Sequence, residues 1–202
     1  MSLGFLLATD GIPSLYYGVE QEFAGGNDPG NRENMWREET FEEVRLDGGV
    51  YKTVPRTYDS DGDGLHDTVW KPWNTTNPTF LKLKSLIALR KENVALRRGD
   101  FKVIYSTSGS GGSDHGIFAF QRQHPDQTAV VVMNLAADDM SQTTTATGSM
   151  PVDLPEGTTL VDRLDPDASW TLTGEGCTPK QGQSCLNVTI GPKSIRILTP
   201  SP

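Results

Sequence analysis

The second half of the chain is built from many short segments rich in β-formers and separated by turn residues such as Gly, Pro and Asp. We expect strands near residues 101–106, 116–123, 128–135, 141–147, 150–154, 158–164, 169–173, 185–190 and 193–199. Short strands at this spacing are typical of an antiparallel β-sandwich or barrel. Residues 130–133 (VVVM) are apolar on both faces, which predicts a central strand.

One long helix is predicted immediately before these strands. Asn77 is a favourable N-cap, and Pro78 stands at the first helical position, where its missing N–H costs nothing. Apolar residues at helical spacing predict one buried face, made of Phe80, Leu83, Leu86, Ile87 and Val94. Arg97 and Arg98 favour the negative end of the helix dipole, and Gly99 is expected to end the helix in a left-handed conformation.

The first 76 residues divide into two parts. Residues 4–26 are apolar and Gly-rich, and residues 12–17 predict a short buried strand. Residues 27–76 have no clean periodicity and predict a long functional loop. The opening residues 1–8 (MSLGFLLA) resemble the middle of a fold rather than a signal peptide, so we expect an artificial start on a longer parent protein.

Charge and hydropathy restrict the partners of the chain. Its 202 residues carry a net charge of -8, which argues against a nucleic-acid partner because such partners need Lys and Arg to meet phosphates. An acidic surface tolerates neutral sugars and accommodates bound cations. No apolar run reaches the roughly 18 residues that a membrane span needs.

Residues 59–67 (DSDGDGLHD) predict a calcium loop. Carboxylates at relative positions 1, 3, 5 and 9 and a glycine at position 6 match the front of an EF-hand-type loop. The expected ligands are the side chains of Asp59, Asp61, Asp63 and Asp67 and the carbonyl of Leu65. Trp70 replaces the bidentate Glu that such loops carry at position 12, so further ligands must come from water or elsewhere. The alternative is a solvated acidic turn.

Two features near the end of the chain bear on its compartment. Cys177 and Cys185 are eight positions apart in a Gly/Pro/Gln-rich stretch, which predicts a disulfide and an oxidising compartment, with two free thiols as the alternative. Residues 187–189 (NVT) are a formal acceptor for N-glycosylation, which is informative only in a eukaryotic secretory protein.

Three strings in the first half carry a resemblance to a known family. Residues 11–21 (GIPSLYYGVEQ) resemble the last barrel strand of α-amylases and their relatives in glycoside hydrolase family 13. Residues 25–36 (GGNDPGNRENMW) are similar to the loop that follows that strand, and residues 86–91 (LIALRK) are similar to the last barrel helix. The family continues into a C-terminal β-sandwich, so the resemblance covers most of the chain in the right order.

The resemblance implies sugar binding without catalysis. The family's retaining mechanism uses two carboxylates about 5–5.5 Å apart, and the matching residues of the family lie on earlier strands, before Gly4. Its loop residues at the positions of Asp28 and Arg32 contact glucose units on the non-reducing side of the cleaved bond. The residues alone leave open a turn held by an Asp28–Arg32 ion pair, and Trp36 could stack on a sugar or anchor the loop. Glu20, Glu22 and Glu33 match no catalytic position of the family, and for Glu20 we expect an orienting role.

The sequence therefore predicts a mostly β chain. Residues 1–98 would be the end of a (β/α)8 barrel, and residues 99–202 an antiparallel Greek-key β-sandwich of the amylase C-terminal type. The parent would be a secreted or periplasmic enzyme that hydrolyses α-1,4-glucosidic bonds of starch and maltooligosaccharides. The fragment would be inactive alone, would need the missing N-terminal part of the barrel, and would self-associate or dock residues 4–26 on the sandwich and helix. Two alternatives remain open, namely a non-catalytic, calcium-stabilised carbohydrate-binding module and a glucanotransferase parent.

Overall fold

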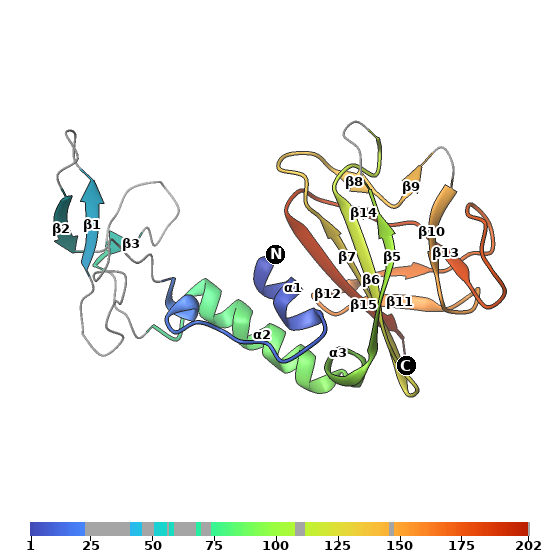
Figure 1. The fold of residues 1–202 in the computed structure, drawn as a ribbon, viewed down its shortest axis with the longest axis horizontal. Helices are drawn as coiled ribbons and strands as arrows, with labels where there is room; N and C mark the ends of the chain where they lie inside the picture. Colours follow the sequence, from blue (N-terminus) through green and yellow to red (C-terminus); the bar gives the residue numbers. More distant parts are fainter. Residues whose placement is uncertain are drawn as a thin grey trace. The chain divides into compact units, whose positions relative to one another are not determined.

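The computed structural model describes residues 1–22, 41–45, 51–55, 57–58, 68–69, 74–107, 112–145 and 148–201 (Figure 1). The chain forms two compact units. One combines Met1–Pro13 with Leu86–Pro202, and the other comprises Ser14–Ser85. The end of the long helix thus groups with the β-rich unit. The boundary that we predict between a barrel part (residues 1–98) and a sandwich domain (residues 99–202) stays a prediction.

A six-stranded antiparallel sheet dominates the β-rich unit. Its members are β5 (Asp100–Ser106), β6 (Ile117–His124), β7 (Gln127–Asn134), β11 (Thr159–Asp162), β12 (Asp165–Thr171) and β15 (Ser194–Pro200). The spatial order is β12-β11-β15-β7-β6-β5, so the last strand of the chain enters the middle of the sheet. Residues 130–133 lie on β7, between β15 and β6, which confirms the predicted central strand.

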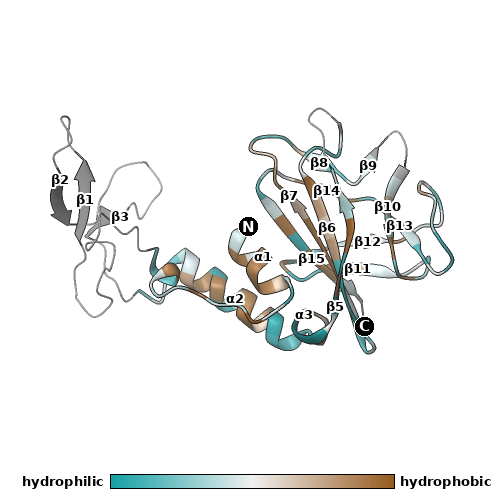
Figure 2. Cartoon of the chain, viewed as in Figure 1, coloured by the Kyte–Doolittle hydropathy of each residue, from teal (hydrophilic) through white to brown (hydrophobic). Residues whose placement is uncertain are grey.

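Smaller sheets complete the unit. The strand β10 (Gly148–Val152) pairs with β9 (Thr144–Thr145) and with β13 (Ser184–Leu186), and β8 (Ser141–Gln142) pairs with β14 (Thr189–Ile190). The core joins both sets of strands and consists of Ile117, Ala119, Val130, Val132, Met150, Val152, Leu160, Leu172, Leu186, Val188, Ile190 and Leu198. Figure 2 shows the hydrophobic residues along β6 and β7. The fold is therefore mostly β and antiparallel, as expected.

The first helix, α1 (Ser2–Ala8), packs on the outer face of the large sheet. A Cβ on Gly4 would stand 3.1 Å from the side chain of Ile195, so glycine permits this close approach. Phe5 meets Phe118 and Phe120 of β6 edge-on, with ring centroids 6.5 and 6.1 Å apart. Residues 4–8 thus pack on the large sheet, whereas the docking that we predict for residues 4–26 as a whole stays a prediction.

Two arginines hold the residues that follow α1. Arg90 donates to the carbonyls of Leu7 (2.7 Å), Thr9 (3.2 Å) and Gly11 (2.8 Å). Arg122 of β6, whose side chain is fully buried, donates to the carbonyls of Ala8 (3.4 Å) and Gly99 (2.7 Å) and to the carboxylate of Asp10 (3.3 Å). No local pattern indicates the role of either arginine, because their acceptors, mostly backbone carbonyls, are far away in the sequence.

The strand predicted for residues 12–17 is absent. Residues 12–16 have no regular secondary structure, and Ile12 is 97% exposed. A lone strand is stable only when a neighbour satisfies its backbone groups, and none of the described residues pairs with this segment. The prediction of a buried strand here is therefore wrong for this chain.

The long helix begins as predicted and is interrupted near its end. It runs as α2 (Pro78–Glu92), breaks at Asn93 and resumes as α3 (Val94–Arg98). Its buried apolar residues are Leu83, Leu86, Leu89, Ala95 and Leu96. Phe80, Ile87 and Val94, which the sequence places on the buried face, are only half-buried. No helix in the described part of the chain has the length and apolar character needed to cross a membrane.

The prediction of a left-handed Gly99 is wrong. Its backbone is extended, with φ −71° and ψ 151°. Glycine is required there for another reason, since a Cβ would stand 2.6 Å from the carbonyl oxygen of Ala95 and 2.9 Å from the backbone of Gln123. The residue therefore allows the helix end to meet β6 closely.

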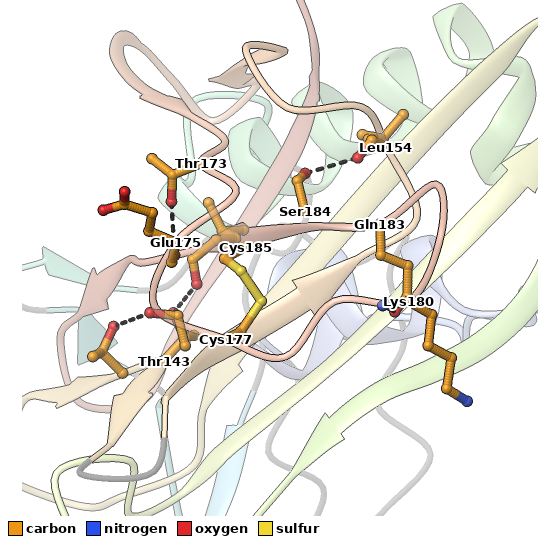
Figure 3. The surroundings of a disulfide bond; sticks show 12 residues. Thr143, Leu154, Thr173, Glu175, Cys177, Lys180, Gln183, Ser184 and Cys185 are labelled. Atoms are coloured by element: carbon orange, nitrogen blue, oxygen red, sulfur yellow. Dashed lines mark hydrogen bonds between the residues drawn. A yellow bond between two sulfur atoms is a disulfide. The ribbon is translucent and has the colours of Figure 1, made fainter.

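A disulfide joins Cys177 and Cys185, whose Cα atoms are 5.7 Å apart (Figure 3). Cys185 is buried on β13 and exchanges two backbone hydrogen bonds with Thr173. Next to it, Gln183 donates to Asp153, which also accepts from Lys102 and from Gln123. The loop closed by the disulfide is thus tied to the large sheet through one carboxylate.

Asp153 should make the unit sensitive to acid. Burial alone would raise its pKa, but the hydrogen bonds from Lys102 and Gln183, the charge of Lys102 and the bond from Gln123 together lower it. A carboxylate whose folded-state pKa is lowered adds stability above its unfolded-state pKa of about 4, and this stability disappears as pH falls through the folded-state value. We expect Asp153→Asn to lower the free energy of unfolding at pH 7 and to flatten its decline below about pH 4.

Urea unfolding of both proteins between pH 7 and pH 2 measures this effect. Asp126→Asn is the matched control, because Asp126 lies in a turn with its side chain 81% exposed. Parallel pH profiles for Asp153→Asn and the unaltered chain would show that the cluster around Asp153 contributes nothing.

Candidate functional site

The unit Ser14–Ser85 contains every residue that the sequence predicts to bind sugar or calcium. The turn that closes the family-like string begins at Gly18, whose φ of 87° lies in the left-handed region that favours glycine. A 3-10 helix, η1 (Val19–Gln21), follows and ends at Glu22, which is also left-handed with φ 57°. These two left-handed residues enclose a compact turn at the end of the family-like string.

Gln21 connects this turn to a segment 53 positions further along the chain. Its side chain is fully buried, and its Oε1 accepts a hydrogen bond of 2.9 Å from the backbone N–H of Asn74. The Nε2 of the same amide has no hydrogen-bond partner among the described residues. Glu22 adds a second link, because it accepts a hydrogen bond from the hydroxyl of Thr79.

The start of α2 provides the other side of this contact. Asn77 is buried, and its Oδ1 accepts from the N–H groups of Thr79 (2.7 Å) and Phe80 (3.4 Å), which confirms the predicted N-cap. Asn74 accepts from the N–H (2.9 Å) and the hydroxyl (2.6 Å) of Thr76, so the chain turns sharply into the helix. We refer to Gln21, Glu22, Asn74 and Thr79 as the base of the loop.

The base of the loop brings together the two ends of residues 23–73. The predicted sugar-contacting residues Asp28 and Arg32 lie outside the described residues, as do Glu33 and Trp36. The sequence reasoning missed Gln21 and Asn74, although Gln21 closes the family-like string and Asn74 stands three residues before the N-cap. A link across 53 positions has no short-range signal.

The predicted calcium ligands Asp59, Asp61, Asp63, Leu65 and Asp67 also lie outside the described residues. The strands that flank them are described, namely β3 (Thr57–Tyr58) and β4 (Thr68–Val69). They pair antiparallel, with Tyr58 opposite Thr68, so the two ends of residues 59–67 stand side by side. An antiparallel pair, β1 (Phe41–Arg45) and β2 (Tyr51–Pro55), precedes them.

Two of the acidic candidates, Glu20 and Glu22, lie within the described residues. Glu20 lies within η1, and Glu22 is engaged by Thr79. A general acid or a nucleophile of a retaining glycosidase needs a second carboxylate close by. Within the residues whose side chains are described, no group of three or more acidic, His or Cys side chains is arranged to hold a metal ion. Glu22 thus belongs to the base of the loop, and the orienting role that we expect for Glu20 stays a prediction.

Replacement of Asn77 by Ala tests the N-cap of α2. The substitution removes the acceptor for two N–H groups at the first turn of α2, and we expect it to lower the free energy of unfolding by about 1 kcal/mol. Asn77→Asp keeps a cap oxygen and should cost less. Chemical denaturation monitored by circular dichroism compares the variants, and a loss equal for Ala and Asp would contradict a capping role.

The chain is similar to several known proteins. No family model matches it. It is 24% identical over 198 residues to a Beta/alpha-amylase of Paenibacillus polymyxa, a match that covers 98% of this chain and 12% of that protein. It is 23% identical over 150 residues to a Cyclomaltodextrin glucanotransferase of a Bacillus species, covering 74% of this chain and 15% of that protein.

The fold is similar to that of a solved structure. An Anoxybacillus α-amylase structure aligns over 99% of this chain and 31% of its own, with a TM-score of 0.57 and 20% sequence identity. The chain spans less than a third of the length of each of these proteins. The chain is thus similar in sequence to amylases and cyclomaltodextrin glucanotransferases, and its structure shares the fold of the matching part of an α-amylase.

Proposed function

We propose that this chain is the C-terminal part of an enzyme that cleaves α-1,4-glucosidic bonds of starch and maltooligosaccharides with retention of configuration. The observation that carries the proposal is the continuous match of nearly the whole chain to a Beta/alpha-amylase, together with the fold it shares with an α-amylase. The chain contributes a sugar-binding loop, and the carboxylates that carry out the reaction belong to the remainder of the enzyme.

Asp28 and Arg32 form the sugar-binding part of this proposal. A carboxylate accepts hydrogen bonds from sugar hydroxyls, and a guanidinium donates them in a fixed fork. Both residues follow the base of the loop within ten positions of Glu22, so their segment starts from a fixed point. A rigid base reduces the ordering entropy lost when a sugar binds, which favours affinity.

The chain alone should not hydrolyse starch. A pure preparation incubated with soluble starch should release reducing sugar no faster than buffer, because both catalytic carboxylates are missing. The control is the same preparation mixed with a trace of active α-amylase, which excludes inhibition of the assay. Hydrolysis that copurifies with the chain through two unrelated chromatographic steps would contradict the proposal.

We also propose a calcium ion held by Asp59, Asp61, Asp63, Asp67 and the Leu65 carbonyl. Four carboxylates within nine residues repel one another unless a cation lies between them, and the β3–β4 pair holds both ends of this segment. A chelator should lower the melting temperature of the unit, and added calcium should restore it. Asp61→Ala should remove this response, whereas Asp126→Ala in the exposed turn should retain it. A chelator response that persists in Asp61→Ala would argue against this loop.

Two other functions have support of their own. The match to a Cyclomaltodextrin glucanotransferase favours glucan transfer as the reaction of the parent, and the contacts that distinguish transfer from hydrolysis lie on the acceptor side of the cleaved bond. The second alternative is a non-catalytic, calcium-stabilised carbohydrate-binding module, and the hydrophobic core of the β-rich unit is compatible with such a module. In that case maltooligosaccharide binding would survive Asp28→Ala. The disulfide supports a secreted or periplasmic location.

A further inference from the structure

Residues 186–190, from the end of β13 to β14, alternate regularly between buried and exposed side chains. Leu186, Val188 and Ile190 enter the core, whereas Asn187 and Thr189 are exposed. Successive side chains of an extended chain point to opposite sides, so Asn187 and Thr189 project from the same surface. They are the first and third residues of the acceptor string Asn-Val-Thr.

The backbone under this string is held from the inside. Thr143 accepts a hydrogen bond of 2.9 Å at its hydroxyl from the N–H of Val188 and donates from that hydroxyl to the Leu186 carbonyl (2.8 Å). The N–H of Thr143 donates to the Val188 carbonyl (3.0 Å). Asn187 takes no part in these bonds, so a group attached to its amide would displace none of them.

A second acceptor string provides an internal comparison. Asn74, Thr75 and Thr76 also satisfy the pattern. Asn74 is half-buried, and its Oδ1 already accepts from the N–H and the hydroxyl of Thr76. Its N–H donates to the buried Gln21. A glycan at Asn74 would therefore disturb the hydrogen bonds at the base of the loop, whereas a glycan at Asn187 would extend from an exposed surface.

We propose that Asn187 is an N-glycosylation site. In the transfer, the Asn187 Nδ2 attacks the anomeric carbon of a lipid-linked oligosaccharide pyrophosphate. A bond forms between Nδ2 and this carbon, the bond from the carbon to the pyrophosphate oxygen breaks, and Nδ2 loses one proton. The lipid pyrophosphate leaves with the electron pair. The disulfide at Cys185, two positions before the acceptor, fits the same compartment, because both modifications occur in the lumen of the secretory pathway.

The test is expression of the full chain in a eukaryotic secretory host, followed by intact mass measurement before and after peptide N-glycosidase treatment in H2¹⁸O. We expect one enzyme-sensitive glycan and an ¹⁸O-labelled aspartate at position 187. Asn187→Gln and Thr189→Ala should each abolish the mass shift. Thr189→Ser should retain it, which separates loss of the acceptor from loss of folding, and Asn74→Gln should leave it unchanged.

Secreted, folded chain without a glycan at position 187 would overturn the proposal, and so would a glycan found only at Asn74. Melting temperatures of Asn187→Gln and the unaltered chain made in a bacterial host should agree, because neither carries a glycan there. The outcome is independent of the amylase proposal, since it requires no sugar binding by the loop and no catalysis.

Discussion

Replacement of Arg122 by Ala is expected to lower the free energy of unfolding by about 3 kcal/mol or more. The side chain is fully buried and donates to the Ala8 and Gly99 carbonyls, so its removal leaves buried acceptors without a partner and opens a cavity. Burial lowers the pKa of Arg122, the charge of Asp10 opposes this, and nearby Arg90 lowers it further. The protein therefore retains a costly buried cation because three acceptors converge on it.

Urea unfolding of a short series separates the contributions. Arg122→Met fills most of the volume and should still cost about 1–3 kcal/mol, which isolates the unsatisfied carbonyls. Arg122→Lys keeps the charge but cannot reach three acceptors in the geometry of a guanidinium. Arg97→Ala, an exposed position on α3, should stay within about 0.5 kcal/mol of the unaltered chain. Equal stability of Arg122→Met and the unaltered chain would show that the segment after α1 is held by packing alone.

Replacement of Phe120 by Ala is expected to cost about 3–5 kcal/mol. Phe120 is fully buried on β6 and lies 4.8 Å from the ring of Phe101 and 6.0 Å from that of Phe118, measured between centroids. It also meets Phe5 of α1, so one side chain joins the helix to the sheet. Phe101→Ala is the matched control, since Phe101 is 37% exposed and should cost clearly less. Thermal and urea unfolding measure both variants, and a similar loss for the two would contradict the central place of Phe120.

The sandwich could be predicted from the sequence because its signals are local. The strands predicted for 101–106, 116–123 and 128–135 match β5, β6 and β7 within a residue or two, since β-branched and aromatic runs bounded by turns have one favourable arrangement. The N-cap at Asn77 could be predicted for the same reason, because its signal is also local. The absence of a strand at residues 12–17 could not be predicted in this way, because a short apolar run forms a strand only where a neighbour pairs with it.

The helix break at Asn93 shows the same limit. The Oδ1 of Asn93 accepts a hydrogen bond of 2.7 Å from the Nε2 of Gln127. The Oε1 of Gln127 in turn accepts a hydrogen bond of 3.2 Å from the N–H of Ala95. Gln127 begins a strand more than 30 residues later, so no window of sequence contains both partners. The base of the loop was missed for the same reason, while Asp28 and Arg32 could be proposed only from the resemblance to a family. Tertiary hydrogen bonds decide these points, and local patterns do not record them.

Calorimetric titration of the chain with a maltooligosaccharide tests the central claim most directly. We expect measurable binding, and Asp28→Ala and Arg32→Ala should each weaken it at least about tenfold, because each removes a charge-assisted hydrogen bond to a sugar hydroxyl. Asp126→Ala should bind like the unaltered chain. Unchanged affinity in Asp28→Ala, or no binding by a chain that circular dichroism shows to be folded, would contradict a sugar-binding loop of the α-amylase type.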